Sequence, residues 1–366
     1  MSLEYLIPDL QNATKEAPAK PVALPPSRRT QMDDPKNYLP DSGLVAAMRV
    51  AVLLRRPLLL TGEAGSGKTQ AGNYLNWKLG YGKKALRFDC KSTSLARDLF
   101  YTYDTIGRFQ AAQAARAAQD ARGAAAAATP VLGHVDKADS EPQVSLSAEH
   151  FITFSALGLA ILRANNGSTT SAWLPGTLIH TGEPVQSVVL IDEVDKAPRD
   201  FPNDLLNEIE NNDFRVPELG NKSFSAAEGF EPLLVITSNS EKNLPGPFLR
   251  RCIYYHLPKP DKARFGAIVK ERLTRDPEKP LIDDALDFLM YLRGKGADLR
   301  KSPSTAELLD FVIFLEGNKL AASDSLRDHP DILVAGLSTL VKDEAKSAGD
   351  SKDLVDGWIK TKPKSN

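Results

Sequence analysis

The chain has 366 residues, of which 42% are hydrophobic and 25% are charged, and its formal net charge at pH 7 is −1. These values are ordinary for a soluble globular protein with room for two domains. The near-zero charge excludes a general attraction to nucleic acid or to a membrane surface. No apolar run reaches membrane-spanning length, and the first residues lack the pattern of a signal peptide. The two cysteines have no metal-ligand spacing, so we expect a cytoplasmic protein in a reducing compartment.

Composition along the chain predicts four parts. A Pro- and Ala-rich stretch over residues 1–36 is typical of an extended arm. An α/β domain is expected over 37–258, with an insertion at about 108–150, and a smaller all-helical domain over 261–341. Residues 342–366 form a charged tail.

A helix predicted from Asp41-Ser42 leads into the most informative segment of the chain. An apolar run over 57–61 predicts a buried strand, and the residues after Thr69 predict a helix start. Between them lies Gly62-Glu63-Ala64-Gly65-Ser66-Gly67-Lys68-Thr69. In this context the backbone N–H groups of the loop surround a phosphate chain, Lys68 contacts the β- and γ-phosphates, and Thr69 is a Mg²⁺ ligand. The segment predicts that the chain binds a nucleoside triphosphate along this whole loop.

A second strand is predicted over 85–89, and the pattern then changes. Residues 111–128 are an alanine-rich tract with almost no apolar bulk, and their helix propensity predicts a projecting helix of several turns before Gly123. Residues 129–147 are polar and irregular. Both a functional insertion and a disordered insertion without a role fit this composition.

The apolar run over 187–191 ends in two carboxylates, Asp192 and Glu193. Consecutive aliphatic residues are typical of a strand that is covered on both faces, as in a parallel sheet. Functional groups gather at the carboxyl ends of such strands, where Asp192 would hold Mg²⁺ directly or through water. Glu193 would orient or deprotonate the attacking water. A hairpin is expected over 214–230.

Two more strands complete the predicted α/β domain. The run over 233–236 predicts a buried strand, and Asn239 follows its end. Arg250 and Arg251 come just before the last strand, which is expected over 253–257.

Apolar residues then recur at helical spacing through 261–341, and Ser304 to Glu307 fit a capping box. One amphipathic piece of the tail, around Trp358, is typical of a docked chain end.

This order of elements resembles the AAA+ ATPases, and more closely the MoxR-type branch, which carries an insert in its second helix. The resemblance covers roughly residues 37–340 and depends on a spaced set of motifs. They are the loop over 62–69 and the segments 190–198, 236–239 and 248–252. It implies an α/β fold, with five parallel strands and flanking helices in the P-loop core, followed by an all-helical lid domain.

The resemblance implies further site residues. Asn239 would be the first sensor, placed between the attacking water and the γ-phosphate. Arg251 would be the arginine finger, which acts on the ATP of the neighbouring subunit. Arg250 is adjacent, and the sequence does not separate the two arginines.

The second sensor departs from the family pattern. The family places an arginine just after a turn of a small residue and proline, and no arginine follows Ser302-Pro303 here. Arg300 or Lys301, just before that turn, is the candidate, and a solvated helix-start charge is the alternative.

As a whole, the resemblance implies an ATP-hydrolysing, Mg²⁺-dependent homo-oligomeric ring, a hexamer, that acts as a remodelling chaperone or activator of a partner. MoxR-type ATPases often work with a protein that carries a von Willebrand factor A domain; the client is unknown. A nucleic-acid motor or restriction-type NTPase is one alternative, supported by Arg108, Arg116 and Arg122, although no aromatic-interleaved basic patch is present. An ATP-binding switch with slow turnover is another, and the presence of Glu193, Asn239 and Arg251 argues against it.

Overall fold

The structure is a computed structural model. It describes residues 33–128, 147–165, 170, 173–175, 183–210, 212–240, 244–294, 299, 301–318, 320–342 and 348–361. The chain divides into two compact units. The first unit takes its described residues from Met1–Lys84, Ile236–Lys242 and Cys252–Asn366, and the second from Ala85–Val235 and Asn243–Arg251. The domain limits expected from the sequence stay a prediction.

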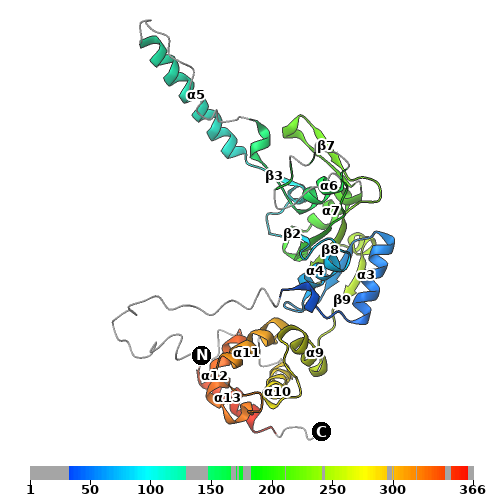
Figure 1. The fold of residues 1–366 in the computed structure, drawn as a ribbon, viewed down its shortest axis with the longest axis vertical. Helices are drawn as coiled ribbons and strands as arrows, with labels where there is room; N and C mark the ends of the chain where they lie inside the picture. Colours follow the sequence, from blue (N-terminus) through cyan, green and yellow to red (C-terminus); the bar gives the residue numbers. More distant parts are fainter. Residues whose placement is uncertain are drawn as a thin grey trace. The chain divides into compact units, whose positions relative to one another are not determined.

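A five-stranded parallel sheet has the strand order β2-β5-β8-β1-β9, and Figure 1 labels its strands β2, β8 and β9. Its members are β1 (Leu58–Thr61), β2 (Leu86–Asp89), β5 (Val188–Asp192), β8 (Leu233–Ser238) and β9 (Ile253–His256). Every residue of the inner strands β1 and β5 is buried, whereas the edge strands β2 and β9 alternate between half-buried and exposed residues. Continuous burial is what a sheet covered on both faces gives its inner strands. The expected fold class is confirmed.

Helix α3 (Ser42–Leu54) begins where the sequence predicts. Its N-cap is Asp41, whose Oδ1 accepts the N–H of Leu44 at 2.9 Å. Tyr255 of β9 donates its hydroxyl to the same carboxylate, and α3 packs against β9. One capping residue therefore fixes both the start of the helix and its position on the sheet.

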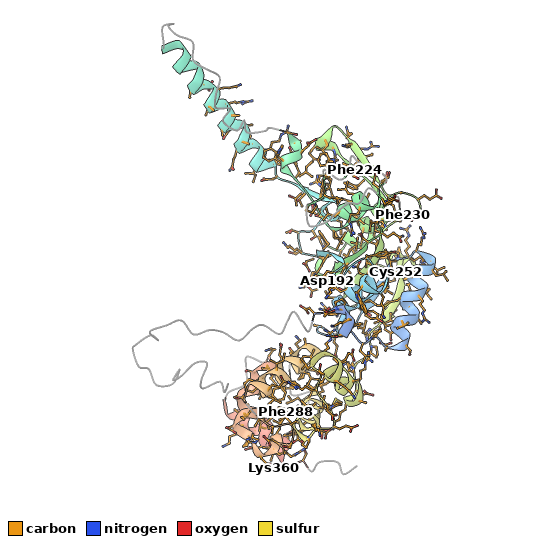
Figure 2. The ribbon with its side chains drawn as sticks, in the orientation of Figure 1. Asp192, Phe224, Phe230, Cys252, Phe288 and Lys360 are labelled. Atoms are coloured by element: carbon orange, nitrogen blue, oxygen red, sulfur yellow. The ribbon has the colours of Figure 1, made fainter. Side chains whose placement is uncertain are left out.

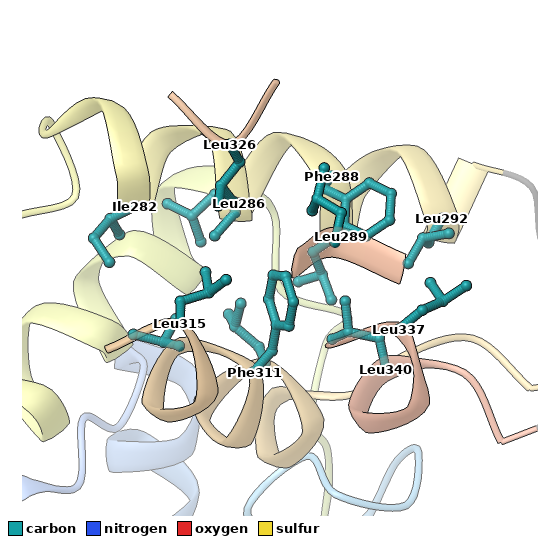
Figure 3. Packing of buried hydrophobic residues seen from close by; sticks show 14 of the residues in the cluster. Ile282, Leu286, Phe288, Leu289, Leu292, Phe311, Leu315, Leu326, Leu337 and Leu340 are labelled. Atoms are coloured by element: carbon teal, nitrogen blue, oxygen red, sulfur yellow. The ribbon is translucent and has the colours of Figure 1, made fainter. Parts of the chain in front are cut away.

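After β9 the first unit continues into the helices α9 (Lys262–Leu273), α10 (Pro280–Gly294), α11 (Thr305–Gly317), α12 (Pro330–Leu340) and α13 (Ala348–Ile359). We call this part the lid. Its core holds Phe288 and Phe311 at the centre of a cluster of buried leucines (Figure 3). The predicted capping box is present, since the side chain of Glu307 accepts the N–H of Ser304 at 2.7 Å. This box fixes the first residue of α11 directly after the turn that contains Pro303.

The predicted tail contains a docked helix, α13. Trp358 is 1% exposed and belongs to the lid core. Arg327 donates from Nη1 to the carbonyl oxygens of Trp358 and Ile359, both at 3.1 Å, and of Thr361 at 2.7 Å. Its guanidinium carbon also lies 4.1 Å from the centroid of the Trp358 ring. One arginine thus satisfies the last carbonyls of the helix and covers its largest side chain.

In the second unit, helix α5 (Thr105–Ala128) begins just after β3 (Tyr101–Tyr103), contacts the short helix Ala148–Phe151 and projects from this part of the unit (Figure 1). The helix predicted before Gly123 is confirmed, and it continues past this glycine to Ala128, because the alanines on both sides outweigh the cost of one glycine, about 1 kcal/mol. The rest of the insertion, residues 129–146, lies outside the described residues. Although α5 is long, the described part of the chain contains no helix that is both long and apolar enough to cross a membrane.

The second unit also contains two small antiparallel pairs. The expected hairpin is confirmed as β6 (Asp213–Val216) and β7 (Lys222–Ser225), and β3 pairs with β4 (Ile152–Phe154). Aromatic rings join the two pairs, because the ring centroid of Phe154 on β4 lies 5.9 Å from that of Phe224 on β7, which Figure 2 labels, and 6.1 Å from that of Phe214 on β6. These rings give the ribbons a core of their own. The unit further contains α6 (Ala156–Ala164), α7 (Phe201–Glu210) and α8 (Gly246–Arg251).

Replacing Trp358 by alanine should destabilise the lid. Removing a fully buried tryptophan leaves a cavity, and we expect a loss of about 3–5 kcal/mol in the free energy of unfolding. Urea denaturation followed by circular dichroism measures the change. Lys352→Ala, an exposed change on the same helix, is the control. Equal stability of the two variants would mean that α13 does not belong to the lid core.

Candidate functional site

The glycine loop over 62–69 has the backbone that its sequence predicts. Three of its glycines have positive φ, at 142° for Gly62, 75° for Gly65 and 94° for Gly67. Gly67 is also the N-cap of α4 (Lys68–Lys78), which places Lys68 and Thr69 in the first helical turn. Residues with a side chain are strained at such φ values, so glycine is needed for the loop to turn back on itself. A loop of this shape at a helix N-terminus is suited to bind an anion.

Lys68 lies inside this loop and is 6% exposed. Its Nζ donates to the carbonyl oxygens of Gly62 and Glu63, each at 2.8 Å, and to Oδ1 of Asn239 at 3.0 Å. Asn239 follows the end of β8. The structure thus brings together two predicted site residues that lie far apart in the sequence. Oxygen acceptors around a buried ammonium offset the loss of its hydration.

A cavity of about 650 Å³ opens beside the loop within the first unit. Its wall combines the loop with the segment before α3, the chain after β9 and helices α9 and α11. The lining includes Tyr38, Leu39, Gly65, Ser66, Gly67, Gln70, Leu257, Pro258, Arg264, Ile268, Arg272, Thr305, Ala306, Leu309 and Asp310. This volume is typical of a small-molecule site.

Two polar atoms in the wall of this cavity are buried without a hydrogen-bond partner, Oγ of Ser66 and Oε1 of Gln70. Buried polar atoms in folded proteins almost always have a partner. The amide nitrogen of Gln70 does have one, since Nε2 donates to Asp33 at 2.8 Å. The two unsatisfied oxygens therefore mark this wall as a place where a polar ligand would supply the missing contacts.

Cations and an aromatic ring form one side of the cavity. The guanidinium carbon of Arg272 lies 5.8 Å from the centroid of the Tyr38 ring, and burial lowers the pKa of Arg272. Burial also raises the pKa of the Tyr38 hydroxyl, which therefore stays protonated. Arg264 donates to the carbonyl oxygen of Leu39. Both arginines come from α9, so the lid fixes the segment that precedes α3.

The predicted carboxylates lie in the second unit. Asp192 is the last residue of β5, is 3% exposed, and has its Oδ2 at 2.9 Å from Nη2 of Arg87 on β2 (Figure 2). Glu193 follows with φ 57° and ψ 51°, a left-handed conformation that is uncommon for a residue with a side chain. Its carboxylate pairs with Lys196, and this bond raises the pKa of the lysine. Such a conformation is often kept at a functional site.

Of the three arginines predicted for the site, the structure describes Arg250 and Arg251. Arg250 and Arg251 close the short helix α8, and both side chains are exposed. Which of them acts as a finger stays a prediction. Arg300 lies outside the described residues, whereas Lys301 is paired with Glu307 of the capping box at 3.8 Å.

Several residues of the site were missed by the sequence analysis. Tyr38, Arg264 and Arg272 line the cavity although they belong to no motif. Arg293 and Lys259, described below, contact Glu63. No local sequence signal marks these residues, because the arginines meet Leu39, Tyr38 and Glu63 only through the fold of the lid.

No protein-family model and no curated protein sequence matches this chain. Domain III of the replication initiation protein DnaA from Thermotoga maritima is similar at 13% identity and a TM-score of 0.36, over 90% of this chain and 98% of that one. PCH-2 from C. elegans is similar at 16% identity and a TM-score of 0.31, over 88% of this chain and 70% of that one. NtrX from Brucella abortus, solved with ATP, is similar at 11% identity and a TM-score of 0.41, over 81% of this chain and 57% of that one. These values are too low to carry an argument about family or function, so the site is interpreted from its own geometry.

Replacing Gly65 by alanine should disturb the loop more than the same change at Gly80. Both glycines have positive φ, 75° and 82°, so both variants carry the backbone strain of about 1–2 kcal/mol. Only at Gly65 would the added Cβ meet another residue, Oγ of Ser304 at 2.4 Å, whereas nothing lies within 4 Å at Gly80. Urea denaturation should show the larger loss of stability for Gly65→Ala. Equal losses would show that Ser304 does not pack on the loop.

Proposed function

We propose that this chain is an ATPase that binds Mg²⁺–ATP at the glycine loop and hydrolyses it. The observation that carries the proposal is the loop itself, with Lys68 enclosed by its carbonyls and by Asn239. The triphosphate would lie along the N–H groups of the loop and at the N-terminus of α4. The base and ribose would occupy the adjacent cavity of about 650 Å³, where Ser66 and Gln70 offer unsatisfied oxygens.

Thr69 and Asp192 are the residues that would hold the magnesium ion. Hydroxyl and carboxylate oxygens are the hard donors that Mg²⁺ prefers, and Mg²⁺ usually keeps several waters and phosphate oxygens as its other ligands. A dedicated protein cage is therefore not required, and the described residues contain no group of three or more His, Cys, Asp or Glu side chains that would form one. When bound, the ion would neutralise charge on the phosphates.

The proposed hydrolysis assigns one task to each remaining residue. Glu193 would accept a proton from the attacking water, and Asn239 would orient that water near the γ-phosphate. Arg251, or its neighbour Arg250, would stabilise the charge of the transition state on an adjacent subunit. The exposure of both arginines supports a role at a subunit boundary. The complete site would then form only in a homo-oligomeric ring, for which we propose six subunits.

The proposed work of the ring is the remodelling or activation of a partner protein, as the MoxR-type resemblance implies. Helix α5 supports this role, because it extends from the second unit and exposes two large apolar side chains near its start. These are Ile106, 71% exposed, and Phe109, 63% exposed. Exposed apolar residues on a projecting helix are suited to contact another protein. A protein with a von Willebrand factor A domain is the proposed partner.

Glu193→Gln should keep ATP binding and lose ATP hydrolysis. The amide preserves the shape of the side chain but cannot take up a proton, so we expect turnover to fall by at least about a hundredfold. Phosphate release measures turnover, and a fluorescent ATP analogue measures binding. Glu228→Gln, an exposed change in the same unit, is the control. Turnover close to that of the wild type would show that another residue activates the water.

A further inference from the structure

The carboxylate of Glu63, the second residue of the glycine loop, has two cationic partners. Its Oε1 lies 2.6 Å from Nζ of Lys259, which follows β9. Its Oε2 lies 3.4 Å from Nη2 of Arg293, which belongs to α10 of the lid. Burial acts to raise the pKa of Glu63, but the two cations outweigh this effect and lower the pKa. The loop is therefore tied to both the sheet side and the lid side of the first unit.

Arg293 is itself held firmly within the lid. Its side chain is 10% exposed, and its Nη1 donates to the carbonyl oxygen of Pro303 at 2.5 Å. The guanidinium carbon lies 5.4 Å from the centroid of the Phe265 ring on α9. A guanidinium removed from water in this way is costly unless a carboxylate accompanies it. Glu63 supplies that carboxylate from outside the lid.

A second contact joins the same two parts. The residue after Pro303 is Ser304, and a Cβ added to Gly65 would lie 2.4 Å from its Oγ and 2.8 Å from its Cβ. The turn over 302–304 thus packs directly on the glycine loop, beside the contact that Arg293 makes. Arg293 contacts this turn through Nη1, which donates to Pro303, and contacts the loop through Nη2, which pairs with Glu63.

We infer that Arg293 is a positioning residue that latches the lid turn over 302–304 onto the glycine loop through Glu63, and so keeps the cavity closed around a bound nucleotide. This inference rests on the proposed function, because the bound molecule is the nucleoside triphosphate. The cavity wall contains both Gly65–Gly67 and the first turns of α11, from Thr305 onward. Separation of the turn from the loop would therefore open the wall, and the nucleotide would leave faster.

The latch predicts that loss of the charge of either Arg293 or Glu63 weakens it. Arg293→Gln and Glu63→Gln should each raise the dissociation rate of a fluorescent ATP analogue about tenfold, as expected for the loss of one charge-assisted contact. The double variant should be no faster than Glu63→Gln alone, because Glu63→Gln already removes the contact with Arg293 along with the contact with Lys259. Arg275→Gln is the matched control, since Arg275 pairs with Glu316 elsewhere on the lid.

Hydrogen exchange of the nucleotide-free protein gives a readout that does not need nucleotide. Amides of residues 302–309 and 63–67 should exchange faster in Arg293→Gln and in Glu63→Gln, but not in Arg275→Gln. Glu63 is 38% exposed, so Glu63→Gln remains informative if Arg293→Gln does not fold. A role of Arg293 in lid packing alone would leave the exchange of residues 302–309 in Glu63→Gln like that of the wild type, which would overturn the latch.

The proposed function and the latch can be refuted by different results. If the wild-type chain binds no ATP analogue, the proposed function is wrong. The contact between Arg293 and Glu63 is then tested by hydrogen exchange alone, and unchanged exchange of residues 302–309 in Glu63→Gln would refute it. If the wild type binds the analogue and Glu63→Gln changes neither its dissociation nor the exchange, the latch is wrong and the proposed function stands.

Discussion

The shape of the glycine loop depends on the burial of the ammonium group of Lys68. Lys68 is almost withdrawn from water, and a lysine in that position must have oxygen acceptors on several sides. Two of them are carbonyls of the loop that precedes it, and the third is the side chain of Asn239. The loop can curve around its own lysine only because glycines take up positive φ along it. The loop ends at the N-terminus of α4, and a helix N-terminus favours an anion.

This constraint extends from the loop to the lid. A loop bent in this way has Gly65 at its surface, where the absence of a side chain lets Ser304 approach. The carboxylate of Glu63 then meets Lys259 and Arg293. The capping box of α11 begins at Ser304, so the helix that lines the cavity starts at the point where the lid touches the loop. Binding of a nucleotide and movement of the lid would therefore be coupled through neighbouring residues of one short turn.

The parts of this site that the sequence predicts are those with local signals. The strand, glycine loop and helix around Lys68 follow from spacing and residue type, and so does the buried strand that ends at Asp192. The contacts around these residues were not predictable, because Arg293 meets Glu63 and Arg272 meets Tyr38 only through the packing of the lid. The left-handed backbone of Glu193 has no sequence signal either. The alanine-rich tract predicts the helix before Gly123 but not its continuation to Ala128, and the role of Arg300 stays a prediction outside the described residues.

The central claim is that Lys68 is the cation of a nucleotide site, and binding of a fluorescent ATP analogue tests it most directly. The account predicts saturable binding by the wild type that ATP reverses. Lys68→Ala should abolish this binding, because the phosphates lose the charge that faces them, a loss of at least about 2 kcal/mol. Lys78→Ala, an exposed change at the other end of α4, should bind like the wild type. Wild-type affinity in Lys68→Ala would contradict the account.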